Sequence, residues 1–198
     1  MTAAIAPATQ DFQRIAGSLA LDFVNTVGNR LGDSRDYFTS ISEVARWAKL
    51  AGLISPRSGL SIKPSSLTAL IAVREELYAT FRPVAVGAPV PRDGLERLNQ
   101  RLAEVFPRRR VTRDVNGFAW AWDADFSAPE YLLGPILFDA ADILISGKFR
   151  RIKQCADESC GWLFVDRSQT GKRRWCSMAD CGNRYKARCF YQRRQAKR

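Results

Sequence analysis

Near its C-terminus the chain reads Cys155-Ala156-Asp157-Glu158-Ser159-Cys160, and fifteen residues later it reads Cys176-Ser177-Met178-Ala179-Asp180-Cys181. These are two cysteine pairs of equal spacing. Four thiolates around one Zn²⁺ complete a tetrahedral structural site with no open position. The chain contains no histidine, so a common alternative ligand is absent. The pattern predicts one structural zinc ion held by Cys155, Cys160, Cys176 and Cys181.

The residues around the pairs predict the fold of this segment. Residues 161–166 (GWLFVD) are rich in strand formers, and residues 169–172 (QTGK) are a turn signal. Residues 173–176 are expected to return as a second strand. Ser177 and Asp180 match a capping box, so a helix should begin at the last ligand, where its dipole favours a thiolate. A knuckle, a hairpin and a helix indicate a treble-clef-like zinc finger.

Two other interpretations of the cysteines stay open. The four could be unconnected, or they could form disulfides. No export signal is visible, and the fifth cysteine, Cys189, would stay unpaired, so disulfides are disfavoured. Cys189 lies about 12 Å beyond Cys181 along a continuous helix. It is therefore expected to be a buried thiol, not a ligand.

The residues after the last ligand carry a family resemblance. Residues 181–184 spell C-G-N-R, and with residues 160–164 (CGWLF) and 174–178 (RWCSM) they resemble the CGNR zinc-finger family of bacterial proteins. Residues 19–27 (LALDFVNTV) resemble the opening motif of the ABATE domain that accompanies this finger. The resemblance covers nearly the whole chain. It implies a stress-associated transcriptional regulator with an α/β N-terminal domain and a zinc-bound, DNA-binding tail, whose four ligand positions match these cysteines.

The distribution of charge supports a polyanionic partner. The 198 residues carry a formal net charge of +11. Residues 148–198 hold 15 basic and 4 acidic residues, whereas basic and acidic residues balance in 1–147. The whole excess therefore lies in the segment with the cysteines, as expected for a neutral body with a nucleic-acid-binding tail. We expect two domains, 1–147 and 148–198, with the boundary near Gly147.

The expected partner is double-stranded DNA, and an RNA-binding or protein-adaptor finger is the alternative. The candidate contacts are Arg167, Lys172, Arg173 and Arg174 on or beside the hairpin, and Asn183, Arg184, Lys186, Arg188, Arg193 and Arg194 on the last helix. Arg184 and Arg188 are four residues apart and share a helix face. Asn183 and Arg184 could instead hydrogen-bond the zinc knuckle.

The N-terminal segment is expected to be mainly helical, which makes the fold class α+β. Apolar periodicity and capping boxes predict helices over 18–27, 40–50, 67–82, 95–106 and 127–146. Residues 18–27 also alternate as a strand would. Pro83 should stop or bend the third helix, and Asp93 should cap the fourth. Asn116-Gly117 predicts a β-hairpin flanked by residues 108–112 and 117–122.

Some side chains in this segment have more than one interpretation. Asp22 and Asn25 are polar residues in an apolar run, so they bind a ligand, contact the other domain, or pair internally with Arg30; internal pairing is favoured. Phe118, Trp120 and Trp122 share one strand face, either as an aromatic ligand box or, as favoured here, packed on helices. Residues 108–110 (RRR) are expected to be a solvated strand edge.

The composition bears on function and location. At 46% hydrophobic and 26% charged residues the chain is globular, and no apolar run approaches the roughly 18 residues of a membrane span. The chain lacks histidine, a nucleophile motif and a glycine-rich phosphate loop, so an enzyme is not expected. We expect a cytoplasmic regulator with no membrane partner. Its N-terminal domain should sense a small-molecule effector or form a homodimer.

Overall fold

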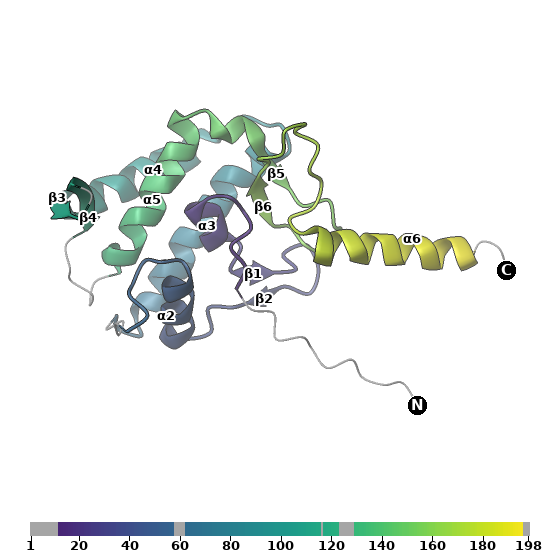
Figure 1. Ribbon diagram of the computed structural model, residues 1–198, viewed down its shortest axis with the longest axis horizontal. Coiled ribbons are helices and arrows are strands. Elements are labelled where there is room, and N and C mark those ends of the chain that lie inside the picture. The colour runs from purple at the N-terminus through teal and green to yellow at the C-terminus, as the bar shows by residue number, and fades with distance from the viewer. Residues whose placement is uncertain (1–11, 58–61, 116, 123–128, 196–198) are drawn as a thin grey trace.

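Helices dominate the computed structural model, which describes residues 12–57, 62–115, 117–122 and 129–195 (Figure 1). The described part of the body contains α1 (Leu19–Val24), β1 (Val27–Gly28), β2 (Arg35–Asp36), α2 (Ile41–Leu50), α3 (Ser66–Ala85), α4 (Arg92–Val105), η1 (Phe106–Arg108), β3 (Arg109–Asp114), β4 (Gly117–Trp122) and α5 (Glu130–Ile145). The C-terminal part contains η2 (Lys148–Arg151), β5 (Ile152–Gln154), β6 (Leu163–Val165), the π-helical turn η3 (Met178–Gly182) and α6 (Asn183–Gln195). Each strand pairs antiparallel in a two-stranded sheet. The predicted α+β class is confirmed.

Local capping signals place several helix ends. The Ser18 hydroxyl accepts the Leu21 N–H at the start of α1, and the Ser40 hydroxyl accepts the Glu43 N–H at the start of α2. Residues 19–24 are therefore helical rather than extended. Gly147, with φ of +75°, follows the end of α5 in the left-handed conformation.

Three details of the helix predictions need correction. Pro91, not Asp93, precedes α4, and Asp93 pairs with Arg97 at 2.8 Å within the first turns. Helix α3 continues two residues past Pro83, which is tolerated because only the last turn loses a hydrogen bond. The predicted cap at Ser127 lies outside the described residues, and α5 begins at Glu130 after Pro129.

One apolar core runs through the body and into the finger. Phe23, Phe38 and Trp47 form an aromatic cluster with ring centroids 5.4–5.9 Å apart. Leu163 and Phe164 of β6 are fully buried in the same core. The division at residue 147 stays a prediction, because packing does not break there.

The β3–β4 hairpin is present, but its aromatic face is only partly covered. Trp122 packs edge-on against Phe138 at 5.2 Å and lies over Gly134 of α5. Trp120 is 61% exposed and Phe118 is 79% exposed. The predicted packing on helices is therefore wrong for Phe118 and Trp120, because only the last residue of β4 reaches α5.

The finger is also built differently from the prediction. The strand before the first cysteine, β5, pairs with β6 in the register Ile152↔Val165. Residues 173–176 are not a strand, so the predicted hairpin partner was wrong. Their backbone is held by isolated hydrogen bonds instead. For example, the Ala156 N–H donates to the Arg174 carbonyl at 2.9 Å. Helix α6 projects away from the body (Figure 1). No helix in the described ranges combines the length and apolar character needed to cross a membrane.

Candidate metal centre and basic surface

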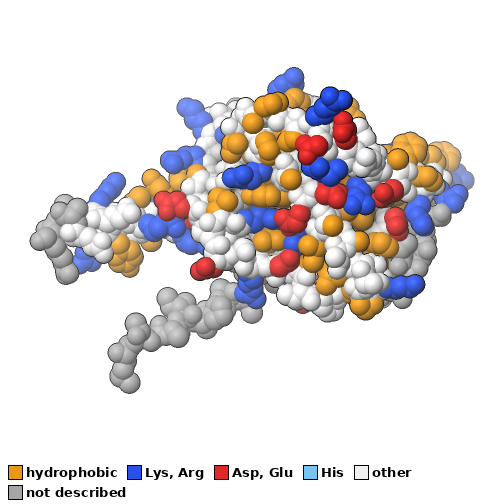
Figure 2. All heavy atoms as spheres, turned by 180° about the vertical axis from the view of Figure 1, so that it is seen from behind, with side chains coloured by type: hydrophobic (Ala, Val, Ile, Leu, Met, Phe, Trp, Pro, Cys, Tyr) orange, Lys and Arg blue, Asp and Glu red, His pale blue; other side chains and the backbone are white. Residues whose placement is uncertain are grey.

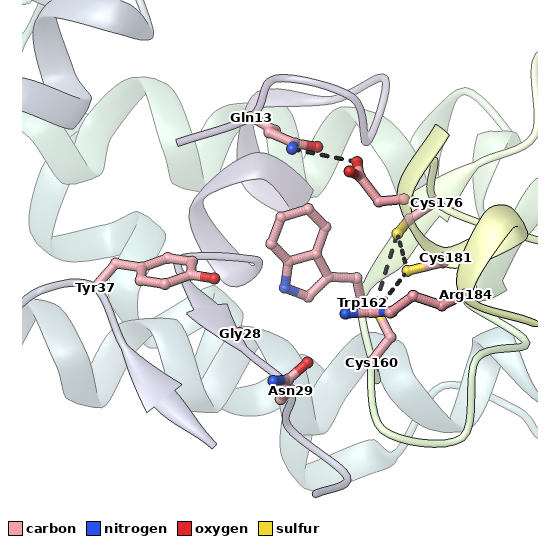
Figure 3. Close-up of a pocket in the computed structure, with 10 residues that line it drawn as sticks. Gln13, Gly28, Asn29, Tyr37, Cys160, Trp162, Cys176, Cys181 and Arg184 are labelled. Carbon is pink, nitrogen blue, oxygen red and sulfur yellow. Dashed lines mark hydrogen bonds between the residues drawn. The ribbon is translucent and has the colours of Figure 1, made fainter. Parts of the chain in front are cut away.

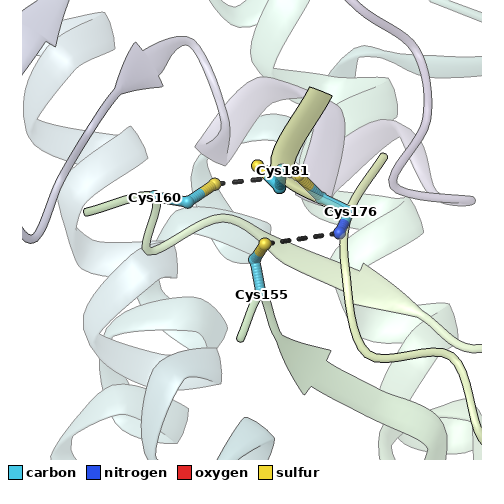
Figure 4. A group of neighbouring side chains, drawn as sticks. All are labelled: Cys155, Cys160, Cys176 and Cys181. Atoms are coloured by element: carbon cyan, nitrogen blue, oxygen red, sulfur yellow. Dashed lines mark hydrogen bonds between the residues drawn. The ribbon is translucent and has the colours of Figure 1, made fainter. Parts of the chain in front are cut away.

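The four predicted cysteines meet in space (Figure 4). All four Sγ atoms lie within 4.8 Å of one another, and all four residues are buried. Cys176 Sγ lies 3.7 Å from Cys160 Sγ and 3.5 Å from Cys181 Sγ. Tetrahedral zinc with Zn–S bonds of about 2.3 Å places its sulfurs about 3.8 Å apart. The residues therefore fit the ion, and the site is that of one structural Zn²⁺.

The four sulfurs strongly perturb one another's ionisation. Interaction with the Cys155 sulfur is the largest cause that raises the pKa of Cys160 and of Cys176 far above the ordinary range, whereas interactions with neighbouring sulfurs lower the pKa of Cys155 and of Cys181. Four thiolates packed this closely repel one another, so a divalent cation is needed to hold them deprotonated. Four protein donors leave no position for water or substrate, so the ion acts on structure.

The first knuckle is shaped by backbone geometry. Gly161 follows Cys160 with φ of +71°, and a Cβ there would lie 2.8 Å from Arg30 Cβ. The Cys155 N–H donates to the Trp162 carbonyl at 2.8 Å, and the Cys160 N–H donates to the Asp157 carbonyl at 3.1 Å. Glycine is needed at position 161 because both its conformation and its surroundings exclude a side chain.

The second knuckle turns directly into the helix. The Ser177 hydroxyl accepts the Asp180 N–H at 3.1 Å, which confirms the predicted cap. Cys181 lies in the π turn η3, immediately before α6. Its Sγ accepts a hydrogen bond from the Arg184 guanidinium at 3.1 Å. Arg184 thus supports the zinc site, one of its two predicted roles, whereas the Asn183 amide donates to the Ala179 carbonyl at 2.9 Å.

Two buried aspartates that sequence reasoning missed hold the finger loops. Asp157 accepts the Ser159 N–H and hydroxyl, and Asp166 accepts the Ser168 N–H and hydroxyl in the same way. The repeated Asp-x-Ser pattern is a turn signal that could have identified both. Asp166 also pairs with Lys153 at 2.8 Å.

These contacts lower the pKa of the Asp166 carboxyl. Burial alone would raise the pKa of its carboxyl, but Lys153 and the donors of Ser168 outweigh burial and hold the pKa well below the ordinary value. Asp166 is therefore a buried anion that fixes the loop between β6 and Cys176.

The predicted contact residues differ in exposure and in the groups that they already bind, and Arg167 is both exposed and bound. Arg184 and Arg188 both pair with Asp157, at 3.3 and 3.2 Å. Arg167 donates to the Gly17 carbonyl, and Arg173 donates to the Ile15 carbonyl. The exposed predicted residues are Arg167, Lys172, Arg174, Asn183, Lys186, Arg193 and Arg194. Cys189 is half-buried on α6 rather than fully buried, and the structure leaves it outside the four-sulfur group.

The finger is docked on the body by side chains from the N-terminal motif. The Asn25 amide donates to the Leu163 carbonyl at 2.8 Å and accepts the Leu163 N–H at 3.0 Å. The Trp162 indole, which lies between Tyr37 and the cysteines in Figure 3, donates to the Val27 carbonyl at 2.7 Å. Asn25 is therefore a contact to the finger.

The favoured internal pairing of Asp22, Asn25 and Arg30 is wrong. Arg30 pairs with Glu75 at 2.7 Å and lies over the Tyr78 ring. Asp22 accepts the Ala16 N–H at 2.9 Å and lies 3.9 Å from the Arg14 guanidinium. Burial raises the pKa of Asp22 to about 6. Asp22 binds the segment just before α1, whereas Asn25 and Arg30 bind residues that are distant in sequence.

Comparison with known proteins agrees with this architecture. Residues 17–147 match the ABATE family model, described as "Putative stress-induced transcription regulator". Residues 151–194 match the model of the CGNR zinc finger. No curated protein matches the chain. The first model covers more than half of the sequence, and the second contains all four clustered cysteines. The chain therefore belongs to the ABATE family and carries a CGNR zinc finger at its C-terminal end.

Proposed function

We propose that this protein is a cytoplasmic regulator that binds double-stranded DNA through its zinc finger and performs no catalysis. In this proposal residues 148–198 bind DNA, and residues 1–147 sense an effector or form a homodimer. The family description and the closed zinc site support a regulator. Thiolate ligands remain available for zinc in the reducing cytoplasm.

The exposed side of α6 is the observation that carries the proposal. Asn183, Lys186, Phe190 and Arg194 recur at helical spacing on one side and are exposed, and Arg193 flanks them. We call these five residues the outer face of α6. The opposite side is partly buried and packs on the finger, as shown by Tyr185 against Trp175 at 5.6 Å.

This division assigns different roles to the basic residues of α6. Arg184 and Arg188 fix the helix by sharing the single carboxylate of Asp157, and Arg184 also donates to Cys181 Sγ, so both side chains are already engaged. Lys186, Arg193 and Arg194 are exposed, and the ion pairs of α6 within the described residues involve Arg184 and Arg188 instead. The helix has 13 residues, about 20 Å in length, and the major groove of DNA admits a helix. The outer face supplies cations for phosphates and Asn183 for a base edge.

A salt series on the zinc-loaded, full-length protein tests the proposal. Fluorescence anisotropy is measured with labelled duplex DNA for the wild type and a triple variant, Lys186→Gln, Arg193→Gln and Arg194→Gln. Each lost phosphate contact reduces the slope of log K against log salt by about 0.9. The triple variant should therefore lose roughly 3 from the slope. A matched control replaces three exposed cations of the body, Lys49, Arg57 and Lys63, with glutamine and should leave the slope unchanged.

Equal slopes in the two triple variants would refute the assignment of the outer face. Absence of binding to any nucleic acid would indicate a protein adaptor instead. RNA is the second candidate, favoured by the exposed rings of Phe190 and Tyr191, which can stack on unpaired bases. A structured RNA of matched length is therefore titrated in parallel, and tighter binding to it would favour RNA over duplex DNA.

A further inference from the structure

A groove lies between α4, α5 and the β3–β4 hairpin, at the end of the molecule opposite α6. Its volume is about 590 Å³, and its apolar walls are formed by Leu102, Phe106, Phe138, Ala141 and Ile145. Figure 2 shows hydrophobic side chains gathered at the end of the molecule opposite α6. The size falls within the range of about 300–1,000 Å³ that is typical of small-molecule sites.

Arg109 is the positive charge of this groove. Its guanidinium carbon lies 4.0 Å from the Phe138 ring centroid and 4.1 Å from that of Trp120. Its Nε is buried and has no hydrogen-bond acceptor among the described residues, and none of the ion pairs of those residues includes Arg109. A residue expected at a solvated strand edge is instead stacked between aromatic rings, with donors left to satisfy.

The carboxylates near Arg109 are already engaged. Asp142 pairs with Lys148 at 2.6 Å, and Asp139 accepts the Ala20 N–H at 2.8 Å and the Ser18 hydroxyl. Arg109 is thus the charge of the groove that lacks a counter-ion among the described residues. A planar guanidinium with free donors matches a carboxylate or sulfonate.

We propose that this groove binds a small organic anion with an apolar body, whose acidic group pairs with Arg109 and whose ring or chain packs on Phe138 and the α4–α5 wall. The inference rests on the proposed regulatory function, for which it supplies the class of effector. The groove is also close to the finger in sequence, because α5, which forms one of its walls, is followed by η2, β5 and then Cys155.

Two fluorescent dyes test this site in the zinc-loaded, full-length protein. The probe 1-anilinonaphthalene-8-sulfonate carries an acidic group, and N-phenyl-1-naphthylamine has the same aromatic body without it. The wild type should bind the sulfonate more tightly, and Arg109→Leu should weaken sulfonate binding at least about tenfold, because the charged hydrogen bonds to the acidic group are lost. Binding of the uncharged dye should change less than about twofold.

Two further variants keep the test decisive. Arg113→Leu removes the same charge from the same face of β3 and should leave both dyes unaffected, since Arg113 lies outside the groove. Ile145→Asp places a negative charge on a side chain that is 86% exposed, so folding is preserved, and it should weaken sulfonate binding at least fivefold. Near-UV circular dichroism confirms that each variant keeps its native packing.

Three results would overturn the proposal. The first is equal loss of both dyes in Arg109→Leu, and the second is unchanged sulfonate binding in Arg109→Leu or Ile145→Asp. The third is a dimer in sedimentation that Ile145→Asp dissociates, because the groove would then belong to a second copy. None of these measurements uses DNA, so a failure here is separable from failure of the DNA-binding proposal.

Discussion

Replacing Asn25 with alanine should weaken the packing of the finger against the body and lower the free energy of unfolding. The Asn25 amide satisfies both backbone groups of Leu163, at 2.8 and 3.0 Å, and Asn25 and Leu163 are 3% and 0% exposed. The variant leaves a buried N–H and a buried carbonyl without partners. Each costs about 1–3 kcal/mol, so the free energy of unfolding should fall by roughly 2–6 kcal/mol. That is a large part of the ~5–15 kcal/mol that stabilises a typical domain.

Urea unfolding followed by tryptophan fluorescence measures this loss, and a chromogenic chelator measures the rate of zinc release. We expect a lower urea midpoint and faster release, because the strand next to the knuckle is less firmly held. Asn99→Ala is the matched control, since Asn99 is exposed on α4 and its loss should cost under about 0.5 kcal/mol. If Asn25→Ala behaves like this control in both assays, Asn25 does not couple the two parts.

Three other variants test the metal, a buried carboxyl and a close contact. Cys176→Ser should reduce zinc from one ion per chain to well below one by elemental analysis, because a four-sulfur site loses a ligand. Asp22 has its pKa raised from 3.8 to about 6, so the wild type should lose up to about 3 kcal/mol of stability as pH rises from 4 to 7. Asp22→Asn should lack that loss, and a pH-independent difference between the two proteins in urea unfolding would contradict the assignment. Gly134→Ala would place a Cβ 2.4 Å from the Trp122 ring, which should cost about 1–3 kcal/mol. An unchanged melting temperature and near-UV spectrum would show that the hairpin is not seated there.

The features that could be predicted from sequence are those set by short spacings or ligand chemistry. The Ser40 and Ser177 caps involve atoms three residues apart, so local sequence determines them. The cysteine cluster was predictable because zinc chemistry demands four donors and the chain offers two equal pairs. The Asn116-Gly117 signal in the sequence likewise predicted the β3–β4 hairpin, whose described strands pair Asp114 with Gly117.

Features that depend on distant partners could not be predicted in the same way. Asn25 binds a strand 138 residues later, and no periodicity reports that pairing. Alternation showed that Phe118, Trp120 and Trp122 share a face, but not how far α5 extends beneath it. Arg184 and Arg188 share a helix face, but their pairing with Asp157 could not be predicted, because the turn that holds Asp157 lies 27 and 31 residues earlier in the sequence.

The contact between β6 and the N-terminal motif limits the transfer of the finger to other proteins. Excising it at Gly147 would strip cover from Leu163, Phe164 and Val165, all of which are at most 4% exposed. Chimeras that transplant the zinc segment onto a foreign scaffold should therefore aggregate unless the α1–β1 stretch travels with it. The zinc finger and the N-terminal motif are therefore packed as one unit, and neither is an interchangeable module.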